Sequence, residues 1–473
     1  MTGEVGFVMR RSRCSIAVVL LLAGILAPRW TTAADNDSSY ATSELTASTG
    51  AAWSPAAPVS GSRPWETAVR LPGRIVSMPF VALGILTNHT VLFAQNTHAL
   101  DGVIGVVDRA RTLGFEVAPA SLGDHAGLGG AVSWAPPRLD RRLLFELSGT
   151  LSQYHRERVT AFVGPVGAVY TADWRPRELY FGRGLATETS GISNYAARSR
   201  AAKLVLAWGW QRPDSVKVRP SGPLMFNDGI RVRGPKHLTW VSAWAGPRTL
   251  SIGEGRDPKA PSFETVHPGE AAGSLDRSVE HFAYGVGVSH DARSGRPHWS
   301  SGWRASVEAQ RYDKPLRGLE LGDAQGEARS FSRLIYRAEA GKSLGRDPRT
   351  LRLSLVAVDQ QFDRSGGTYL LADLQTLGGG AGLSGFESGR FRDVDLALAK
   401  LSYIFPLVKN LEFDMHAETG GVYPGLTLAR VSTLQTSAGA ALRIRGDDAM
   451  IGAIGCDWSR ETARIWFALG GIE

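Results

Sequence analysis

The stretch of sequence that decides the fold is Leu411-Glu412-Phe413-Asp414-Met415-His416-Ala417-Glu418-Thr419-Gly420. Its apolar side chains at 411, 413, 415 and 417 alternate with polar side chains at 412, 414, 416 and 418. Successive side chains of a β-strand point to opposite faces, whereas the apolar face of a helix repeats every three or four residues. The stretch therefore predicts a β-strand with one apolar face, which includes Phe413, and one polar face.

The same alternation recurs from about residue 127 to the end of the chain. Clear apolar faces are Leu143, Phe145, Leu147 and Leu151; Phe282, Tyr284, Val286 and Val288; Trp303, Ala305, Val307 and Ala309; and Leu351, Leu353 and Leu355. A soluble sandwich also alternates, but its strands commonly have about five or six residues. The segments here alternate for roughly nine to thirteen residues, and a tilted strand needs about 9 to 11 to cross a bilayer. The pattern favours an all-β fold, a transmembrane antiparallel β-barrel over residues 118–473.

Polar faces and turns support the same fold. Arg329, Arg333, Arg337 and Glu339 place both signs of charge on one face, which suits a hydrated barrel interior. Tight turns, as at 406–410 and 446–448, contrast with a long glycine-rich one at 363–389. Short turns at one end and long loops at the other are typical of bacterial barrels, which have an even number of strands. We expect about 14 to 16 strands and favour 16.

The N-terminal third has a different character. Residues 1–34 read as a signal peptide, with a basic start, an apolar core at 15–27 and small residues before the cleavage region. A membrane anchor is the alternative, but this core is short against the roughly 20 residues that a spanning helix needs. Residues 35–64 are rich in Ser, Ala, Thr and Pro and predict a disordered linker. Residues 65–117 have apolar side chains at roughly helical spacing and predict a short periplasmic helical segment.

Composition narrows the class of protein. The 473 residues include 55 glycines and 13 tryptophans but only 2 cysteines, a balance of turns and interfacial aromatics. The formal net charge of +8 is dispersed along the chain and predicts no nucleic-acid partner. After the signal, no apolar run is long enough for a spanning helix, so a membrane location requires a closed barrel in which neighbouring strands satisfy every backbone group.

Two C-terminal motifs resemble those of a known family. Gly382-Leu383-Ser384-Gly385-Phe386 begins a segment that ends at Asp393, and Leu401-Ser402-Tyr403-Ile404-Phe405-Pro406-Leu407 follows it. This order is similar to the outer-membrane insertase superfamily (BamA/TamA-like, bacterial surface antigen family). Members of that family carry a V/L-R-G-F/Y tetrad at the tip of a loop that folds into the barrel lumen, then a strand ending in Y-R-F-P-L.

The resemblance implies three groups of site residues and a lumen loop at 363–391. The lumen-loop motif is Leu383, Ser384, Gly385, Phe386, Arg390, Phe391, Arg392 and Asp393; the barrel-wall motif is His416, Glu418 and Gly420; and the early-strand motif is Phe181, Gly182 and Gly184. The barrel-wall motif stands where the family carries F-x-D-x-G. The early-strand motif is similar to an F-G-x-G segment of these barrels.

Among the departures from the family pattern, two concern the lumen loop and the periplasmic part. Ser384 stands where the tetrad has arginine, so Glu418, the expected acid on the barrel wall, would lose its partner. Arg390 and Arg392 are the candidates to replace that arginine. The segment 65–117 is also too short for a complete polypeptide-transport-associated domain, the periplasmic module of the family.

The resemblance implies an outer-membrane protein that assembles, inserts or translocates protein or lipid substrates. The implied partners are outer-membrane lipid and protein clients or a periplasmic partner, with a monomeric barrel and no cofactor. Two alternatives are an outer-membrane lipid hydrolase and a purely structural or channel barrel. Ser289 and His290 point to opposite faces of a strand and cannot form a dyad, and no G-x-S-x-G elbow occurs. We therefore predict no catalytic residues.

A metal site or proton relay is the remaining alternative for the polar face at 412–418. Residues two apart on one strand face are separated by about 6.6 Å. All four side chains cannot share one ion at that spacing. We therefore predict lumen-lining polar residues here, and no metal site.

Overall fold

The computed structural model describes residues 112–120, 129–136, 143–209, 215–218, 230–233, 238–269, 277–292, 301–315, 329–344, 349–363, 371–408, 411–445 and 450–469. They all belong to the second of two units, Val76–Glu473. The predicted signal, the linker and the helical segment up to residue 111 lie outside the described residues. Residues 115–117, which the sequence assigned to that segment, belong to the first strand.

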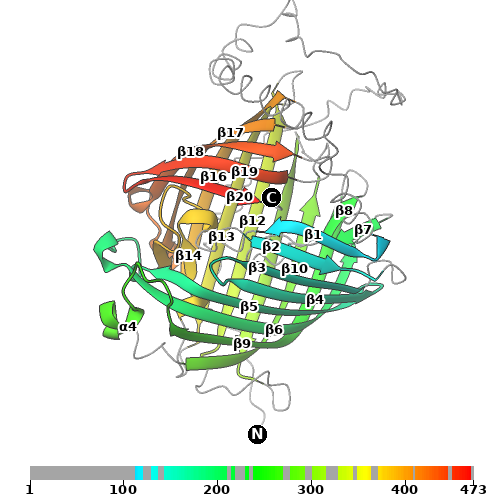
Figure 1. Ribbon diagram of the computed structural model, residues 1–473, viewed down its shortest axis with the longest axis horizontal. Coiled ribbons are helices and arrows are strands. Elements are labelled where there is room, and N and C mark those ends of the chain that lie inside the picture. The colour runs from blue at the N-terminus through cyan, green and yellow to red at the C-terminus, as the bar shows by residue number, and fades with distance from the viewer. Residues whose placement is uncertain are drawn as a thin grey trace, which may run out of the picture. The chain divides into compact units, whose positions relative to one another are not determined.

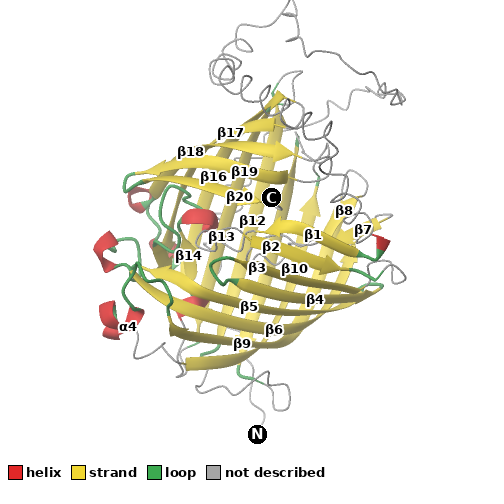
Figure 2. Cartoon of the chain, in the orientation of Figure 1, coloured by secondary structure: helices red, strands yellow, loops and turns green. Residues whose placement is uncertain are grey.

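Strands make up most of the described chain (Figures 1 and 2). They are β1 (Phe115–Ala120), β2 (Gly129–Trp134), β3 (Leu143–Thr150), β4 (His155–Val163), β5 (Val166–Tyr180), β6 (Ser193–Gly209), β7 (Ser215–Val218), β8 (Ile230–Arg233), β9 (Leu238–Glu254), β10 (Arg277–Asp291), β11 (Gly302–Asp313), β12 (Phe331–Ser343), β13 (Thr350–Phe362), β14 (Gln375–Leu377), β15 (Phe391–Asp393), β16 (Asp395–Val408), β17 (Leu411–Tyr423), β18 (Gln435–Arg445), β19 (Met450–Ser459) and β20 (Ala463–Leu469). The described helices are α4 (Phe263–Val266) and the single turns η2 (Thr189–Gly191), η3 (Leu371–Asp373), η4 (Gly379–Ala381), η5 (Leu426–Leu428) and η6 (Val431–Thr433).

Sixteen of the described strands form one antiparallel sheet. Its order is β1-β2-β3-β4-β5-β6-β9-β10-β11-β12-β13-β16-β17-β18-β19-β20, while β7 pairs with β8 and β14 with β15 in separate sheets. The sheet curls so that β1 and β20, the two ends of this order, contact each other (Figure 1). The predicted all-β antiparallel barrel is confirmed. The total number of spanning strands stays a prediction, since this count covers the described residues alone.

An apolar belt of exposed side chains covers the outer face of the sheet. Its described members include Val166, Leu204, Leu206, Trp208, Tyr284, Val286, Val288, Trp303, Val307, Leu401, Ile454 and Trp458. On β6 the alternation is sharp, because Leu206 is 50% and Trp208 65% exposed while Ala207 between them is 9% exposed. Soluble proteins rarely expose so large an apolar surface, whereas strands that face lipid do so by construction.

One outward residue departs from expectation. The sequence placed Phe413 on the lipid face, and its neighbour Ala417 on the same side of β17 is indeed exposed. Phe413 itself is only 7% exposed. Its ring packs against Phe405 of β16, with centroids 5.4 Å apart, within a cluster that also contains Leu407. Cross-strand aromatic packing thus covers it, which alternation alone does not reveal.

Candidate functional site: the lumen loop and its anchors

The connection between β13 and β16 packs against the inner face of the sheet. Its residues Leu377, Leu383, Phe386 and Phe391 are all 0% exposed. They form one apolar cluster with inward side chains of β12, β13, β16 and β17, namely Ile335, Val358, Leu396 and Val422. Burying these side chains stabilises the loop by the ordinary hydrophobic effect. The predicted bounds of the lumen loop, 363–391, thus change slightly: the connection runs up to residue 394, before β16, and from here on the lumen loop means its described residues 371–394.

The tip of the lumen loop is a tight turn held from both sides. Leu383 has a φ of +57°, which is unusual for a residue with a side chain. Its complete burial offsets the cost of that conformation. The Phe386 backbone N–H donates to the Leu383 carbonyl at 2.9 Å and closes the turn. The motif Leu383-Ser384-Gly385-Phe386 therefore forms a closed turn that packs against the inner face of the barrel wall.

Gly385 is the point of closest approach between this tip and the barrel wall. A Cβ atom on Gly385 would lie 2.4 Å from the Trp458 carbonyl oxygen and 2.8 Å from the Ser459 nitrogen. Side-chain carbon atoms do not approach backbone atoms that closely. Glycine is required here so that the tip can rest directly on the backbone of β19.

Two wall side chains bind the backbone of the tip. Glu418 Oε2 accepts a hydrogen bond from the Ser384 N–H at 2.6 Å. Arg464 of β20 donates through Nη1 to the carbonyl oxygens of Ser384 at 3.1 Å and Phe386 at 2.7 Å. Hydrogen bonds that involve a charged group are the stronger kind. At position 384, where the resembled tetrad has arginine, an arginine of the barrel wall thus binds the carbonyl oxygen of the loop.

The expectation that Glu418 would lack a partner is wrong. Lys400 Nζ lies 2.8 Å from Glu418 Oε1, and Ser437 Oγ donates to Oε2 at 3.1 Å. Lys400 stands directly opposite Glu418 in the pairing of β16 with β17, and Ser437 stands opposite it on β18. The register of the two neighbouring strands therefore gives Glu418 a cationic partner and a hydroxyl donor, although position 384 carries no arginine.

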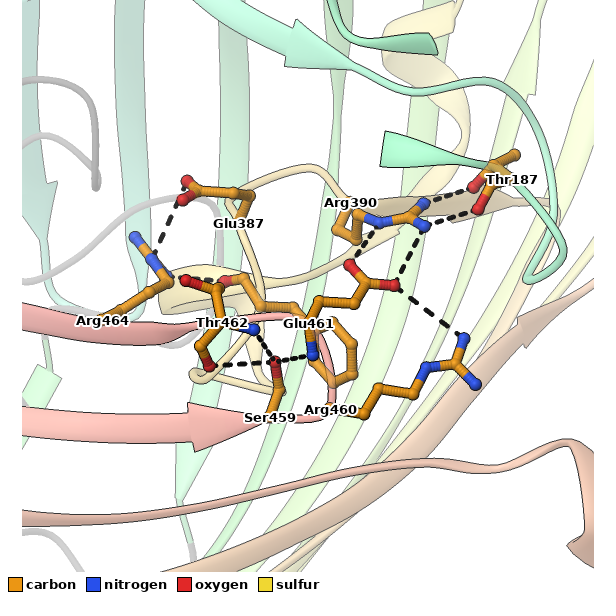
Figure 3. Close-up of polar contacts among 9 residues, drawn as sticks. Thr187, Glu387, Arg390, Ser459, Arg460, Glu461, Thr462 and Arg464 are labelled. Atoms are coloured by element: carbon orange, nitrogen blue, oxygen red, sulfur yellow. Dashed lines mark hydrogen bonds and ion pairs between the residues drawn. The ribbon is translucent and has the colours of Figure 1, made fainter. Parts of the chain in front are cut away.

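Arg390, one of the two candidate replacements, binds elsewhere. Its Nε and Nη2 atoms lie 2.7 and 3.0 Å from the two carboxylate oxygens of Glu461, and its other donors bind the hydroxyl and carbonyl oxygens of Thr187 (Figure 3). The guanidinium also lies over the rings of Phe181 and Phe391. The Arg390 side chain is only 2% exposed, so this two-pronged ion pair is buried on one side.

Local turn chemistry presents Glu461 to the lumen loop. Glu461 lies in the turn between β19 and β20, where Ser459 Oγ accepts hydrogen bonds from the backbone N–H groups of Glu461 and Thr462, both at 3.2 Å (Figure 3). The Ser459 N–H donates in turn to the Thr462 carbonyl at 2.9 Å. Serine stabilises short turns in this way. The turn fixes the direction of the Glu461 side chain toward Arg390.

Arg392 and Asp393 join the lumen loop to the segment that follows β5. Arg392 Nη1 donates to the Tyr195 hydroxyl at 2.6 Å, and the Gly184 N–H donates to the Arg392 carbonyl at 2.8 Å. Asp393 Oδ1 accepts from Arg183 Nε at 2.7 Å. The structure thus brings the early-strand motif and the lumen-loop motif together. Neither Arg390 nor Arg392 contacts Glu418 in the described part of the chain.

The start of the lumen loop has its own anchor. Asp373 Oδ1 accepts from Arg248 Nη1 of β9 at 2.8 Å, and its carbonyl accepts from Arg333 Nη2 of β12 at 2.9 Å. Burial by itself raises the pKa of Asp373, but the facing Arg248 charge, with smaller contributions from His281 and Arg333, brings the pKa below its ordinary value. The loop is therefore fixed at its start, its tip and its return.

Ser384, His416 and Asp457 also meet, but not as a nucleophilic triad. Ser384 Oγ lies 3.3 Å and Asp457 Oδ1 3.1 Å from the same atom, His416 Nε2. A triad needs the base and the orienting acid on different ring nitrogens, so that the ring can pass a proton. Among the described residues, no cluster of three or more His, Cys, Asp or Glu could hold a metal ion. The third barrel-wall residue, Gly420, lies against the backbone of β16 at Ala397.

Sequence reasoning missed most of the residues that hold the loop. Arg248, Lys400, Glu461 and Arg464 carry no motif. For Arg464 a signal existed in the sequence, because strand alternation places it on the face opposite Ile465 and Phe467. In the structure these two side chains are 79% and 56% exposed, so Arg464 lies on the inner face of β20. Glu461 lies in a turn, where alternation gives no direction. Its role depends on contact with a segment about 70 residues away.

The fold and these anchors define the chain as an all-β barrel with a loop packed inside its wall. No protein-family model and no curated protein matches the sequence. Among solved structures, the chain is similar to BamA from Haemophilus ducreyi lacking POTRA domains 1–3, at 12% identity and a TM-score of 0.46, over 76% of this chain and 68% of that one.

It is also similar to CdiB from Acinetobacter baumannii, at 14% identity and a TM-score of 0.41, and to CdiB from Escherichia coli, at 12% and 0.42. Both matches cover 76% of this chain, which spans 57% and 60% of those CdiB chains.

Proposed function

We propose that this protein is exported to the bacterial outer membrane and inserts or translocates protein or lipid substrates there. The apolar belt supports the membrane location, because only lipid or detergent can cover exposed leucine, valine and tryptophan side chains over so many strands. The motif resemblance supports the class of activity. The observation that carries the proposal is the junction between the first and last strands.

The two terminal strands are short and lie in contact, but no backbone pairing between them is found among the described residues. β1 has 6 residues and β20 has 7, whereas β6 and β9 have 17 each. β1 and β20 contact each other, yet no backbone pairing joins them among the described residues. An unpaired strand edge presents N–H and C=O groups that can template an incoming strand. A barrel that keeps such a junction can open it to a client, whereas a structural barrel has no use for one.

The lumen loop fits this function as an internal brace. Arg464, which binds the loop tip, is on β20 itself, and Glu461, which binds Arg390, directly precedes β20. The last strand is therefore attached to the loop through side chains as well as to β19 through its backbone. This arrangement keeps β20 in place while its outer edge is free to pair.

The test is to lock the junction. Cysteine pairs are scanned between Phe115–Ala120 and Ala463–Leu469 in a Cys456→Ser background, and the protein is reconstituted in phosphatidylcholine liposomes. Insertion of a urea-unfolded small barrel is followed by its heat-modifiable gel mobility. We expect faster insertion than into empty liposomes, loss of the gain when a β1–β20 disulfide forms, and recovery with reductant.

The matched control is a disulfide inside an existing ladder. Ala440 stands directly opposite the native Cys456 in the pairing of β18 with β19, so Ala440→Cys offers a bridge that leaves the junction free. This variant should insert the client at the wild-type rate when oxidised. No stimulation by the wild type would contradict the proposed function, and equal rates for locked and unlocked protein would contradict the role of the junction.

A further inference from the structure

Three arginines lie exposed on the outer face of the barrel, beyond the apolar belt. Arg198 and Arg200 belong to β6, and Arg256 follows the end of β9. All three side chains are exposed, and Trp174 of β5, which is half-buried, contacts Arg198 and Arg256. None has a carboxylate partner among the described residues. We call Arg198, Arg200, Arg256 and Trp174 the arginine cluster.

Strand alternation fixes the direction in which the cluster points. Arg198 and Arg200 occupy even positions of β6, as do Leu204, Leu206 and Trp208 of the apolar belt. Even positions on one strand share a face, so these arginines point toward the surroundings of the barrel and not into the lumen. Only Ala202 separates Leu204 from Arg200 along that face.

The position along β6 places the cluster at an interface. Apolar side chains fill the outer face from Trp208 to Leu204. Arg200 lies four residues from Leu204 toward the Ser193 end of the strand, a distance of about 13 Å. That end of β6 adjoins the β5–β6 connection, on the same side as the lumen loop. An exposed arginine is costly at the middle of a bilayer and nearly neutral at its edge. The cluster therefore lies at the level of lipid headgroups.

The geometry of the cluster leaves its hydrogen-bond donors available. The Cζ atoms of Arg198 and Arg256 lie 4.9 and 5.5 Å from the centre of the Trp174 ring. Stacking of this kind uses the flat face of a guanidinium and leaves the N–H groups at its edge free. Arg198 stands directly opposite Trp174, and the backbone N–H of Arg256 donates to the Pro176 carbonyl at 2.8 Å, which fixes both arginines beside β5.

We propose that the arginine cluster binds the phosphate groups of a phosphorylated lipid in the membrane leaflet next to the long loops. Guanidinium edges match phosphate oxygens in pairs, and the acyl chains would lie along the apolar belt below. On the outward face of the sheet, the exposed acid Glu157 is two strands away across Ala172. Glu254 is also exposed, but it stands opposite Tyr195, whose side chain is buried on the inner face. The proposal rests on the transmembrane fold and not on the proposed function.

The test measures lipid binding by the full-length protein in a zwitterionic detergent. The probes are bis-phosphorylated lipid A and the same lipid after removal of both phosphates. We expect each of Arg198→Ala, Arg200→Ala and Arg256→Ala to weaken binding of the first probe about 5-fold, and the triple variant about 100-fold. Trp174→Ala should also weaken binding, although it removes no charge, because the two stacked arginines lose their orientation. Heat-modifiable gel mobility verifies that each variant is folded.

Arg430→Ala is the matched control, because Arg430 is an exposed arginine in the β17–β18 connection with no described side-chain partner. It should change the affinity less than 2-fold. Wild-type affinity in the triple variant would overturn the proposal, and so would equal binding of the dephosphorylated lipid. A loss in Arg430→Ala as large as that in the single cluster variants would show attraction by net charge alone and would overturn it as well. The insertion assay uses neutral liposomes, so either proposal can fail without the other.

Discussion

Arg183 and Asp393 are 210 residues apart in the chain and are joined by a hydrogen bond of 2.7 Å between Nε and Oδ1. Arg183 lies just after β5 and its side chain is 37% exposed, whereas Asp393 ends the lumen loop and its side chain is 3% exposed. This pair connects the early strands of the barrel to the loop, while Arg390 and Glu461 connect the same loop to the last hairpin. The loop therefore ties together the two halves of the sheet that meet at the β1–β20 junction.

Removing the acid from the Arg390–Glu461 pair should release the return of the lumen loop. Glu461→Gln leaves the buried Arg390 guanidinium without its counter-charge, a change that typically costs about 3 kcal/mol. We expect faster amide hydrogen exchange across residues 386–394. Arg460→Gln is the control, because Arg460 is 63% exposed and lies 3.9 Å from Glu461. Equal exchange in both variants would mean that Glu461 does not hold the loop.

A single methyl group at position 385 should lift the loop tip from the wall. In Gly385→Ala the new Cβ would meet the Trp458 carbonyl oxygen at 2.4 Å, and rigid backbone on both sides leaves little room to adjust. The expected destabilisation is about 1 to 3 kcal/mol. Limited proteolysis should cut the loop more readily. In Gly425→Ala the new Cβ would meet only the Thr427 Oγ1 atom, at an ordinary contact distance of 3.8 Å, and the backbone is extended, so this variant should behave as wild type. Similar sensitivity of the two variants would contradict the close approach.

An arginine at position 384, as in the resembled tetrad, should stabilise the lumen loop less than the resemblance suggests. In isolation Ser384→Arg would gain a charge-assisted contact of about 1.5 to 3 kcal/mol with Glu418. Glu418 already binds Lys400 and the Ser384 N–H, so the new side chain competes for an occupied carboxylate. A double-mutant cycle of Ser384→Arg with Glu418→Gln, read by loop hydrogen exchange, should show coupling below about 1 kcal/mol. A larger coupling energy would mean that Lys400 does not occupy Glu418.

Acid should loosen the start of the lumen loop only at low pH. The pKa of Asp373 in the folded protein lies below its ordinary value of 3.8, because Arg248 outweighs the opposing effect of burial. The contribution of Asp373 to stability is then complete above that ordinary value and is lost as the pH falls through the lowered pKa. Protection of residues 371–375 from proteolysis by an acid-active protease should persist at pH 5 and be lost only below pH 3.8, the ordinary pKa of the carboxyl group. In Asp373→Asn the protection should already be reduced at pH 5, and wild-type behaviour of that variant would exclude the Arg248 contact as the anchor.

Local pattern was enough to predict the fold from the sequence. Period-two alternation is a property of each strand alone, so it showed which segments are strands and which faces are apolar, as on β10 and β11. The lumen-loop motif was also visible in the sequence, because its glycines and aromatics are contiguous. Phe413 marks the limit of this reasoning, since its burial depends on Phe405 across the β16–β17 pair.

Only the tertiary structure decided which residue each motif residue meets. Lys400 binds Glu418 because the register of β16 and β17 sets them opposite each other, and Glu461 meets Arg390 because the last hairpin lies against the returning loop. The first contact depends on the register of one strand pair, and the second on the curl of the whole sheet, to which every strand contributes. The sequence determined by itself that the chain forms strands with a lipid face and a lumen face; the closing of the sheet determined where the loop is held, because residues far apart in the chain become neighbours only in the folded barrel.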